Sequence, residues 1–266
     1  MYFKIEENQV FGAGNIVPAS ASEPVIVLLH GAGMDHTFWT YNTRYFLGRG
    51  ASVIALDFPG HGSSSGAFLG TINEMACWVV SCLDALGVGS FSLAGHSMGA
   101  LVALALAGEE KDRVSRLALL GAGFPMPVSA PLLEAAQNDN QAARDMVILF
   151  GHGSRAYLGG SAVPGMNIMG SALRLLERSA PGALYNDLNA CNEYADGLAA
   201  AKQVSAVTRL ICGEEDKMTP VVAAAAILET INKATLSVIP LTGHMMVSES
   251  PELTHRHLVS ALTPDC

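Results

Sequence analysis

Short runs of valine, isoleucine and leucine recur along the chain, and they contain few polar residues. A strand with one face in water alternates apolar and polar residues, whereas a parallel strand covered on both faces is apolar almost throughout. The runs therefore predict buried strands of a parallel sheet. The clearest are Val25–Leu29, Val53–Leu56, Phe91–Ala94, Arg116–Leu120, Leu210–Cys212 and Leu236–Ile239.

Segments with a helical pattern separate these runs. Pro220 and Pro251 stand where helix-starting prolines are favoured, because the first helical N–H has no intrahelical acceptor to lose. The alternation of strands and helices predicts an α/β fold, with a mostly parallel sheet and helices on both faces. The expected helices cover about Thr37–Leu47, Ile72–Leu86, Met98–Gly108, Pro220–Asn232 and Pro251–Leu262.

The interval from Phe124 to Gln203 interrupts this alternation of strands and helices. It is rich in alanine, leucine, methionine and glycine, and it contains no strand candidate of comparable quality. A segment of this length is too long for a loop and reads as several helices. We interpret it as a helical cap over one end of the sheet. The prediction divides the chain into a core of residues 1–123 and 204–266 and a cap of residues 124–203.

The composition narrows the class of protein. Half of the 266 residues are hydrophobic and 15% are charged, against about 25% charged residues in a typical soluble domain. This balance excludes an intrinsically disordered chain and indicates a large buried fraction. The apolar run Met98–Ala107 is about half the length of a membrane-spanning helix, which needs about 20 residues. We therefore expect no membrane span.

The charges and cysteines exclude further classes. The net charge is −9, from 15 basic and 24 acidic residues without a lysine or arginine cluster, so nucleic acid is not an expected partner. No secretory signal pattern begins the sequence, and the five cysteines are scattered. Reduced thiols and a cytoplasmic location are expected. No CxxC pair or histidine–cysteine cluster suggests a metal, and no cofactor is expected. The oligomeric state is open.

The strongest chemical signal is the pentapeptide Gly95-His96-Ser97-Met98-Gly99. It is a G-x-S-x-G motif between a predicted strand and a predicted helix, which is the context of a nucleophile elbow. The serine occupies a strained turn that exposes its hydroxyl, and bulky side chains two residues before or after it would clash. The helix behind it directs backbone N–H groups and a positive dipole end toward the site.

Four more blocks accompany this motif, each directly after a predicted strand. With them the chain resembles the α/β-hydrolase superfamily over nearly its whole length outside the predicted cap. The resemblance implies a mostly parallel α/β-hydrolase sheet with a helical cap inserted after the sixth strand, and catalytic residues in the order Ser, Asp, His. The blocks are His30–Gly33, Asp57–Ser63, Gly213–Pro220 and Gly243-His244.

A serine hydroxyl is a weak nucleophile until a base takes its proton. Among the eight histidines, His244 follows the last predicted strand in a glycine-bounded loop and is the predicted base. Asp216 is the predicted acid that holds the imidazole tautomer. Glu214 and Glu215 are rivals by charge, but they precede the aspartate of the family's G-x-x-D-x-x-T-P pattern. Asp57 is a weaker alternative, because its block mainly shapes a turn in this superfamily.

The oxyanion of a tetrahedral intermediate needs two backbone donors. We expect one from Met98, after the nucleophile, and the resemblance points to Ala32 for the other. Methionine-rich and aromatic segments predict an adaptable apolar pocket. The candidate pocket residues are Phe38, Trp39, Phe124, Met126, Met146, Tyr157 and Met245.

The superfamily hosts many reactions, so the fold alone does not choose one. Ser97 disfavours epoxide hydrolases and dehalogenases, which use an aspartate nucleophile. Met245 disfavours the hydroxynitrile lyases that have lysine at this position and the C–C bond hydrolases that have tryptophan there. The leading hypothesis is a serine hydrolase that cleaves a small or medium apolar carboxylic ester through an acyl-enzyme. The alternatives are a C–C bond, lactone or thioester hydrolase, or a hydrolase-like ligand receptor.

Overall fold

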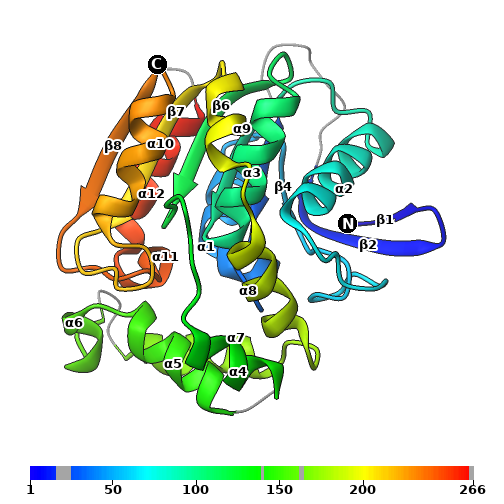
Figure 1. Cartoon of the computed structure of the whole chain (residues 1–266). Coiled ribbons are helices and arrows are strands. Elements are labelled where there is room, and N and C mark those ends of the chain that lie inside the picture. Colours follow the sequence, from blue (N-terminus) through cyan, green and yellow to red (C-terminus); the bar gives the residue numbers. More distant parts are fainter. Residues whose placement is uncertain (16–24, 139–140, 162–164, 264–266) are drawn as a thin grey trace.

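The computed structural model describes residues 1–15, 25–138, 141–161 and 165–263. These residues form an eight-stranded sheet in the order β1-β2-β4-β3-β5-β6-β7-β8 (Figure 1). The pairs β1–β2 and β2–β4 are antiparallel, and all the other pairs are parallel. The strands are β1 (Tyr2–Ile5), β2 (Asn8–Asn15), β3 (Val25–Leu29), β4 (Val53–Leu56), β5 (Phe91–His96), β6 (Val114–Leu120), β7 (Val207–Gly213) and β8 (Ala234–Ile239).

The six predicted strands are confirmed as β3 to β8, and several are longer than their apolar runs. The strands β1 and β2 were not predicted from the sequence. β1 alternates exposed and half-buried residues, and both ends of β2 are exposed or half-buried. These two strands therefore lack the apolar runs from which the other six were predicted.

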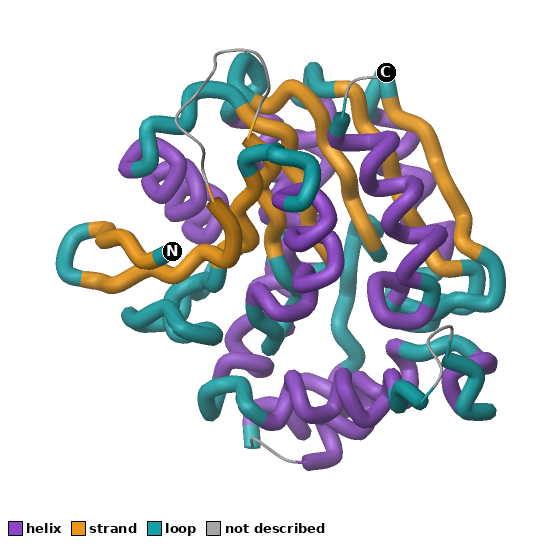
Figure 2. Tube along the Cα trace, turned by 180° about the vertical axis from the view of Figure 1, so that it is seen from behind, coloured by secondary structure: helices purple, strands orange, loops and turns teal. Residues whose placement is uncertain are grey.

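Helices cover both faces of the sheet, and alternate residues of β3 show it. Val27 and Leu29 join one buried cluster with α2 and α3, whereas Ile26 and Leu28 join another with α1 and α12. Figure 2 shows the same layers from behind. This arrangement explains why the inner strands are apolar throughout. The four helices are α1 (Thr40–Leu47), α2 (Ile72–Ala85), α3 (Met98–Glu109) and α12 (Pro251–Leu262).

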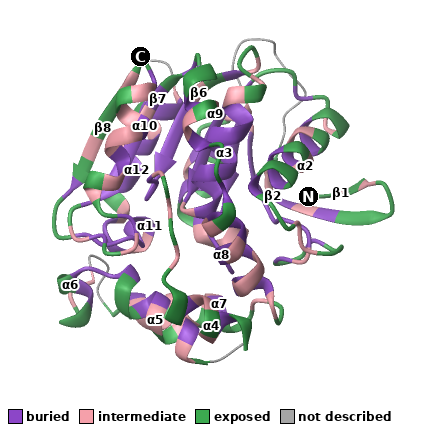
Figure 3. Ribbon diagram, viewed as in Figure 1, coloured by how far each residue is buried: buried purple, intermediate pink, exposed green. Residues whose placement is uncertain are grey.

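The helix α3 is buried along most of its length (Figure 3). Its residues Met98–Ala107 are at most 2% exposed, because α9 (Gly197–Gln203) packs over it on the side away from the sheet. A Cβ at Gly108 would lie 2.8 Å from the carbonyl oxygen of Ala200 in α9, so the two helices approach closely. The apolar run therefore makes a core helix. No helix of the described ranges has the length and apolarity needed to cross a membrane.

The segment between β6 and β7 is helical, as predicted, in its described part. Figure 1 shows α4, α5 and α7 lying together beyond the carboxyl ends of the parallel strands, with α8 rising from them toward the sheet. α9 packs on α3 and α10. The division into core and cap at residues 124 and 203 stays a prediction. The helices are α4 (Ala130–Gln137), α5 (Gln141–Gly151), α6 (Ser154–Tyr157), α7 (Ile168–Glu177), α8 (Ala183–Glu193) and α9.

Two predicted helices differ in detail from those observed. The predicted helix Thr37–Leu47 divides into a short 3₁₀ helix, η1, followed by α1. The predicted helix Pro220–Asn232 divides into η2 followed by a short α10. The remaining short helix, α11, follows the last strand and leads into α12. The bounds are η1 (His36–Trp39), η2 (Val221–Ala224), α10 (Ala225–Thr230) and α11 (Met246–Glu249).

Candidate active site

Ser97 lies in the sharp turn between β5 and α3. Its φ of 54° and ψ of −116° belong to a region that side-chain-bearing residues rarely adopt. A Cβ at Gly95 would lie 2.0 Å from the carbonyl oxygen of Gly99, and one at Gly99 would lie 2.5 Å from that of His30. Both glycines are therefore required by close backbone approach. The turn has the strained geometry that the motif predicts.

Asp216 and His244 meet at the carboxyl ends of β7 and β8. Nδ1 of His244 donates to Oδ2 of Asp216 over 2.8 Å, and Thr219 donates both its N–H and its hydroxyl to the same carboxylate at 2.8 Å. Burial alone would raise the pKa of Asp216. The His244 charge and these hydrogen bonds outweigh it, so the pKa of the carboxyl lies below its ordinary value. Asp216 is thus held as a carboxylate behind the imidazole.

Ser97 and His244 line the same cavity. In the described part of the chain, no hydrogen bond joins the serine hydroxyl to the imidazole. Catalytic hydrogen bonds are often long until substrate binds. The fold thus brings the three residues to one edge of the sheet, with the hydrogen bond between acid and base already formed.

His96 holds the loop that carries His244 in place. Nε2 of His96 donates to the backbone carbonyl of His244 over 2.9 Å, and the Phe38 ring stacks on His96 with 4.5 Å between centroids. Burial, followed by the His244 charge, lowers the pKa of His96 to about 3. His96 is therefore a neutral donor that fixes the loop.

Glu249 of α11 fixes the same loop from the other side. Its buried carboxylate accepts the N–H of Gly243 at 3.1 Å and that of Gly153, before α6, at 2.7 Å. The N–H of Met245 donates to the carbonyl of Gly151 at 3.0 Å. The loop of His244 is thus tied to the end of α5 and the start of α6.

The two predicted oxyanion donors lie beside the nucleophile. Ala32 lines the cavity with Ser97, and Met98 is the first residue of α3. The N–H groups of a helix's first turn have no intrahelical acceptor, so that of Met98 is available to a ligand. Their role as an oxyanion hole stays a prediction.

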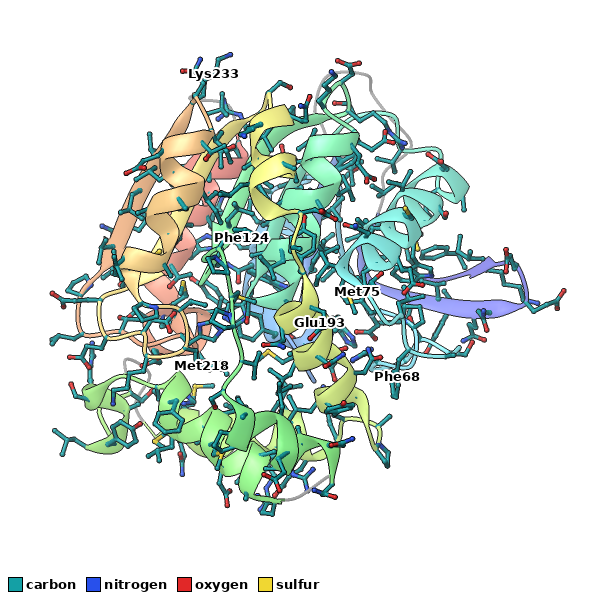
Figure 4. The ribbon with its side chains drawn as sticks, viewed as in Figure 1. Phe68, Met75, Phe124, Glu193, Met218 and Lys233 are labelled. Atoms are coloured by element: carbon teal, nitrogen blue, oxygen red, sulfur yellow. The ribbon has the colours of Figure 1, made fainter. Side chains whose placement is uncertain are left out.

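The cavity has a volume of about 280 Å³ and lies between the sheet edge and the helices that follow β6. Met218, labelled in Figure 4, lies where the loop after β7 faces these helices. Most of the lining is apolar, and Lys217 is the cationic side chain at its exposed rim. The lining residues are Ala32, Ser97, Met126, Pro127, Val128, Ser129, Leu132, Met146, Phe150, Leu188, Cys191, Lys217, Met218, Thr219 and His244.

Comparison with known proteins identifies the family. Residues 26–256 match the model of the alpha/beta hydrolase family. This chain belongs to that family. It is 30% identical to a 2-hydroxymuconate semialdehyde hydrolase of Pseudomonas sp. over 258 residues, which cover 89% of this chain and 86% of the relative.

Two further comparisons describe this alpha/beta hydrolase. It is 40% identical over 130 residues to a dihydrolipoyllysine-residue acetyltransferase component of an acetoin cleaving system from Pseudomonas putida, covering 47% of this chain but only 35% of that relative. The enol-lactonase from Burkholderia xenovorans LB400 superposes with a TM-score of 0.83 at 19% identity, over 98% of each chain. This second likeness shows the fold alone.

The predicted pocket residues of this alpha/beta hydrolase divide into two groups. Met126 and Met146 line the cavity. Phe38 and Trp39 do not, and the prediction is corrected for them. The Phe38 ring stacks on His96, and Trp39 is fully buried on the α1 side of the sheet.

Three more predicted pocket residues lie outside the cavity lining. Phe124 packs against Tyr194 and against Gly197, where a Cβ would lie 2.2 Å from its ring. Tyr157 lines a separate cavity between α5, α6 and α7. Met245 is buried in the core beside Gly151. Sequence position alone does not say toward which side these residues turn.

Several lining residues were not among the predicted pocket residues, although one of them lies on α5, which also carries Met146. They include Leu132 of α4, Phe150 of α5, and Leu188 and Cys191 of α8. Apolar periodicity identifies such helices but not which apolar position faces a cavity. No sequence signal distinguishes these residues from ordinary core residues.

The three alternative candidates for the catalytic acid form hydrogen bonds away from His244. Glu214 accepts the N–H of Leu241, and Glu215 accepts the hydroxyl and N–H of Ser154. Asp57 accepts the N–H and Nδ1–H of His36, at 2.6 and 2.9 Å. Asp57 thus stabilises the turn after β4, as its sequence block suggests.

A group of potential metal ligands gathers near Asp57. Within the described ranges, ligand atoms of Asp35, His36 and Asp57 lie within 4.8 Å of one another. Asp35 also caps η1 through the N–H of Thr37 and pairs with Arg178. Hydrogen bonds and an ion pair within the protein therefore account for this cluster.

Proposed function

We propose that this alpha/beta hydrolase cleaves a small or medium apolar carboxylic ester with Ser97 as its nucleophile. The observation that carries the proposal is that Ser97, in its strained turn, shares an apolar cavity with His244, which is hydrogen-bonded to Asp216. The cavity volume of about 280 Å³ is near the lower end of the range of about 300–1,000 Å³ typical of ligand pockets. This size favours short and medium acyl groups.

The proposed reaction has two halves, acylation and deacylation, and the same groups act in both. Nδ1 of His244 faces Asp216, so Nε2 takes the proton from the Ser97 hydroxyl as the oxygen attacks the ester carbonyl. The N–H groups of Ala32 and Met98 hold the oxyanion. His244 then gives its proton to the leaving alcohol. A water molecule repeats these steps on the acyl-enzyme and releases the acid.

The test compares Ser97→Ala with Ser129→Ala on p-nitrophenyl acetate, butyrate and octanoate. Ser129 lines the same cavity and serves as the matched control for loss of a hydroxyl. Ser97→Ala should lower kcat by about a thousandfold or more, and Ser129→Ala should stay within a few-fold of wild type. Equal, slow hydrolysis by wild type and Ser97→Ala would refute the proposal that this protein cleaves esters with Ser97.

Covalent labelling separates an enzyme from a ligand receptor. A fluorophosphonate reacts quickly with a serine that a base activates. A hydrolase should form a single adduct at Ser97, and the adduct should disappear in His244→Ala. Slow labelling at the rate of Ser129 would favour a receptor that binds its ligand without turnover.

A second candidate is hydrolysis of a substrate that carries a free carboxylate, and Lys217 is the observation that favours it. Its side chain lines the rim of the cavity, and within the described residues its ammonium forms no ion pair. Glu215 accepts hydrogen bonds from Ser154, and these bonds, followed by the charge of Lys217, lower the pKa of Glu215. The relative that aligns over most of this chain is named for a muconate semialdehyde, which is a carboxylic acid.

Paired substrates test this candidate. The p-nitrophenyl hemiester of glutarate carries a carboxylate, and its methyl-capped analogue does not. Lys217→Met should lower kcat/KM for the hemiester by about twofold to fivefold, the range expected for one exposed charge, and should leave the capped ester unchanged. Lys202→Met on α9 is the control. An equal effect of Lys217→Met on both esters would refute the charge recognition.

A further inference from the structure

Asp187 is a charged residue that the reaction scheme above does not use, although it lies against the predicted oxyanion loop. It is carried by α8, and its side chain is fully buried. Oδ2 accepts the N–H of Gly33 at 2.8 Å and Nε2–H of His61 at 3.0 Å. One carboxylate therefore joins the loop after β3, the loop after β4 and a helix more than 120 residues later in the chain.

Gly33 is the tightly bent position of the loop after β3. Gly33 has a φ of 66°, a conformation that disfavours side chains. A Cβ there would lie 3.1 Å from the side chain of Leu184, one turn before Asp187 on α8. Gly33 is adjacent to Ala32, so a rotation of the peptide at Gly33 also turns the backbone at Ala32.

The partners of His61 show that Asp187 is a charged acceptor. Nδ1 of His61 faces the carbonyl of Pro59 at 3.0 Å, and Nε2 faces Asp187. Both ring nitrogens must donate, so the imidazole carries two protons and a positive charge. In agreement, the Asp187 charge and hydrogen bond outweigh burial and raise the pKa of His61. A paired, hydrogen-bonded carboxylate without solvent is a rigid anchor.

The same helix forms part of the cavity wall. Leu188 and Cys191 of α8 line the cavity, while Asp187 turns toward Gly33. α8 therefore supports the acyl pocket and the oxyanion loop together. A shift of this helix would move both.

We propose that Asp187 is a positioning residue for the oxyanion hole, acting through the N–H of Gly33 to orient the N–H of Ala32. This inference rests on the proposed function, because it assigns Ala32 to oxyanion binding. Asp187 touches no substrate in this scheme. It holds the donor in place before the reaction begins, so the donor needs no reorganisation in the transition state.

The experiment separates oxyanion binding from substrate binding. The variants are Asp187→Ala, which removes the acceptor, and Asp187→Asn, whose amide oxygen in the place of Oδ2 still accepts from Gly33 and from His61 but carries no charge. The control is Asn189→Ala, which removes a half-buried amide of the same helix that does not line the cavity. Each is assayed for kcat and KM on p-nitrophenyl butyrate and for inhibition by a trifluoromethyl ketone, which forms an oxyanion at the serine.

Asp187→Ala should lower kcat by about tenfold to a hundredfold, less than or equal to the loss of one complete donor. The affinity for the trifluoromethyl ketone should fall by the same factor, and KM should change by less than about threefold. Asp187→Asn should retain kcat within about fivefold, since it keeps the acceptor for Gly33. Asn189→Ala should retain both kcat and inhibitor affinity.

A purely structural role would lower the thermal midpoint without this matched loss of kcat and inhibitor affinity, and that result would overturn the inference. If Asp187→Ala does not fold, Asp187→Glu replaces it, since the added methylene displaces the acceptor and should lower kcat and inhibitor affinity by a common factor. Unequal factors would also overturn it. Absence of Ser97-dependent turnover in the wild type would instead refute the proposed function.

Discussion

At the scale of single residues, the site depends on positions where only a hydrogen atom fits. Gly95, Gly99 and Gly121 surround Ser97 and His244, and a Cβ at each would lie within 3 Å of a backbone or ring atom. Such contacts are shorter than van der Waals distances, so the structure would have to shift to relieve them. The strained backbone of Ser97 is maintained by these close contacts and by its N–H, which donates to the carbonyl of Leu120 at 2.9 Å.

This crowding predicts the effect of adding one methyl group. Gly95→Ala should destabilise the protein by about 3 kcal/mol or more, because the new Cβ meets rigid backbone. Gly89→Ala is the matched control, since a Cβ there meets nothing within 4 Å, and it should change stability by less than about 0.5 kcal/mol. Urea unfolding of both variants measures the difference. Equal stability would show that the turn has room to relax.

At the scale of secondary-structure elements, the site is assembled by pairs of elements that lie far apart in sequence. The loops after β7 and β8 bring Asp216 to His244, and α8 brings Asp187 to the loops after β3 and β4. Each contact is a hydrogen bond between groups that are removed from water. Loss of one partner would therefore leave a buried polar or charged group unpaired, which costs more than the bond itself contributes.

The pair of His61 and Asp187 predicts a pH dependence of stability. The folded state raises the pKa of His61, so folding favours the protonated ring. Its stabilising contribution is complete below the ordinary histidine pKa of about 6.5 and is lost as the pH rises through the higher pKa of the folded state. His61→Gln should thus be most destabilising near pH 6, and the gap to wild type should narrow toward pH 9.

Chemical unfolding at several pH values measures this gap. Each unit of difference between the folded and unfolded pKa corresponds to about 1.4 kcal/mol. Asn189→Ala on α8 changes no titratable group and no contact of Asp187, so its effect should not vary with pH. A gap for His61→Gln that is constant from pH 6 to 9 would contradict a charged imidazole in the folded protein.

At the scale of the whole molecule, the cavity exists because the helices that follow β6 lie over the carboxyl ends of the strands. One wall comes from the loops after β3, β5, β7 and β8, and the other from α4, α5 and α8. Substrate size is therefore set by side chains of helices that carry none of the predicted catalytic residues. Ligand sites at this edge of a parallel sheet are common, because the strand ends place loops from several elements together.

The position of Met146 predicts how to narrow the cavity. Met146→Trp in α5 should lower kcat/KM for p-nitrophenyl octanoate by about tenfold or more, because the larger ring occupies space needed by a long acyl chain. Acetate should be affected less than about threefold. Leu149→Trp in the same helix is the control, since Leu149 is 52% exposed and does not line the cavity. A uniform loss for both esters would refute this assignment of the cavity.

Much of the framework was predictable from local signals. The six parallel strands, from Val25–Leu29 to Leu236–Ile239, and the buried helix after Ser97 follow from apolar runs. The hairpin of β1 and β2 lacked such a run and was missed. In the site, Asp216 and His244 were predicted from motif spacing after strands, and the structure brings them together. Five of the seven predicted pocket residues lie elsewhere, because the facing of each helix depends on its partners.

The sequence by itself determined the six parallel strands, the main helices between them, the family of the fold and the steric requirements of the elbow, since these depend on local patterns and motif spacing. Only the tertiary structure decided which side chains form the cavity and that Asp187 reaches Gly33 across 154 positions. The physical reason is that burial patterns identify which residues avoid water, while the partner of each buried group is fixed by how separate elements pack together.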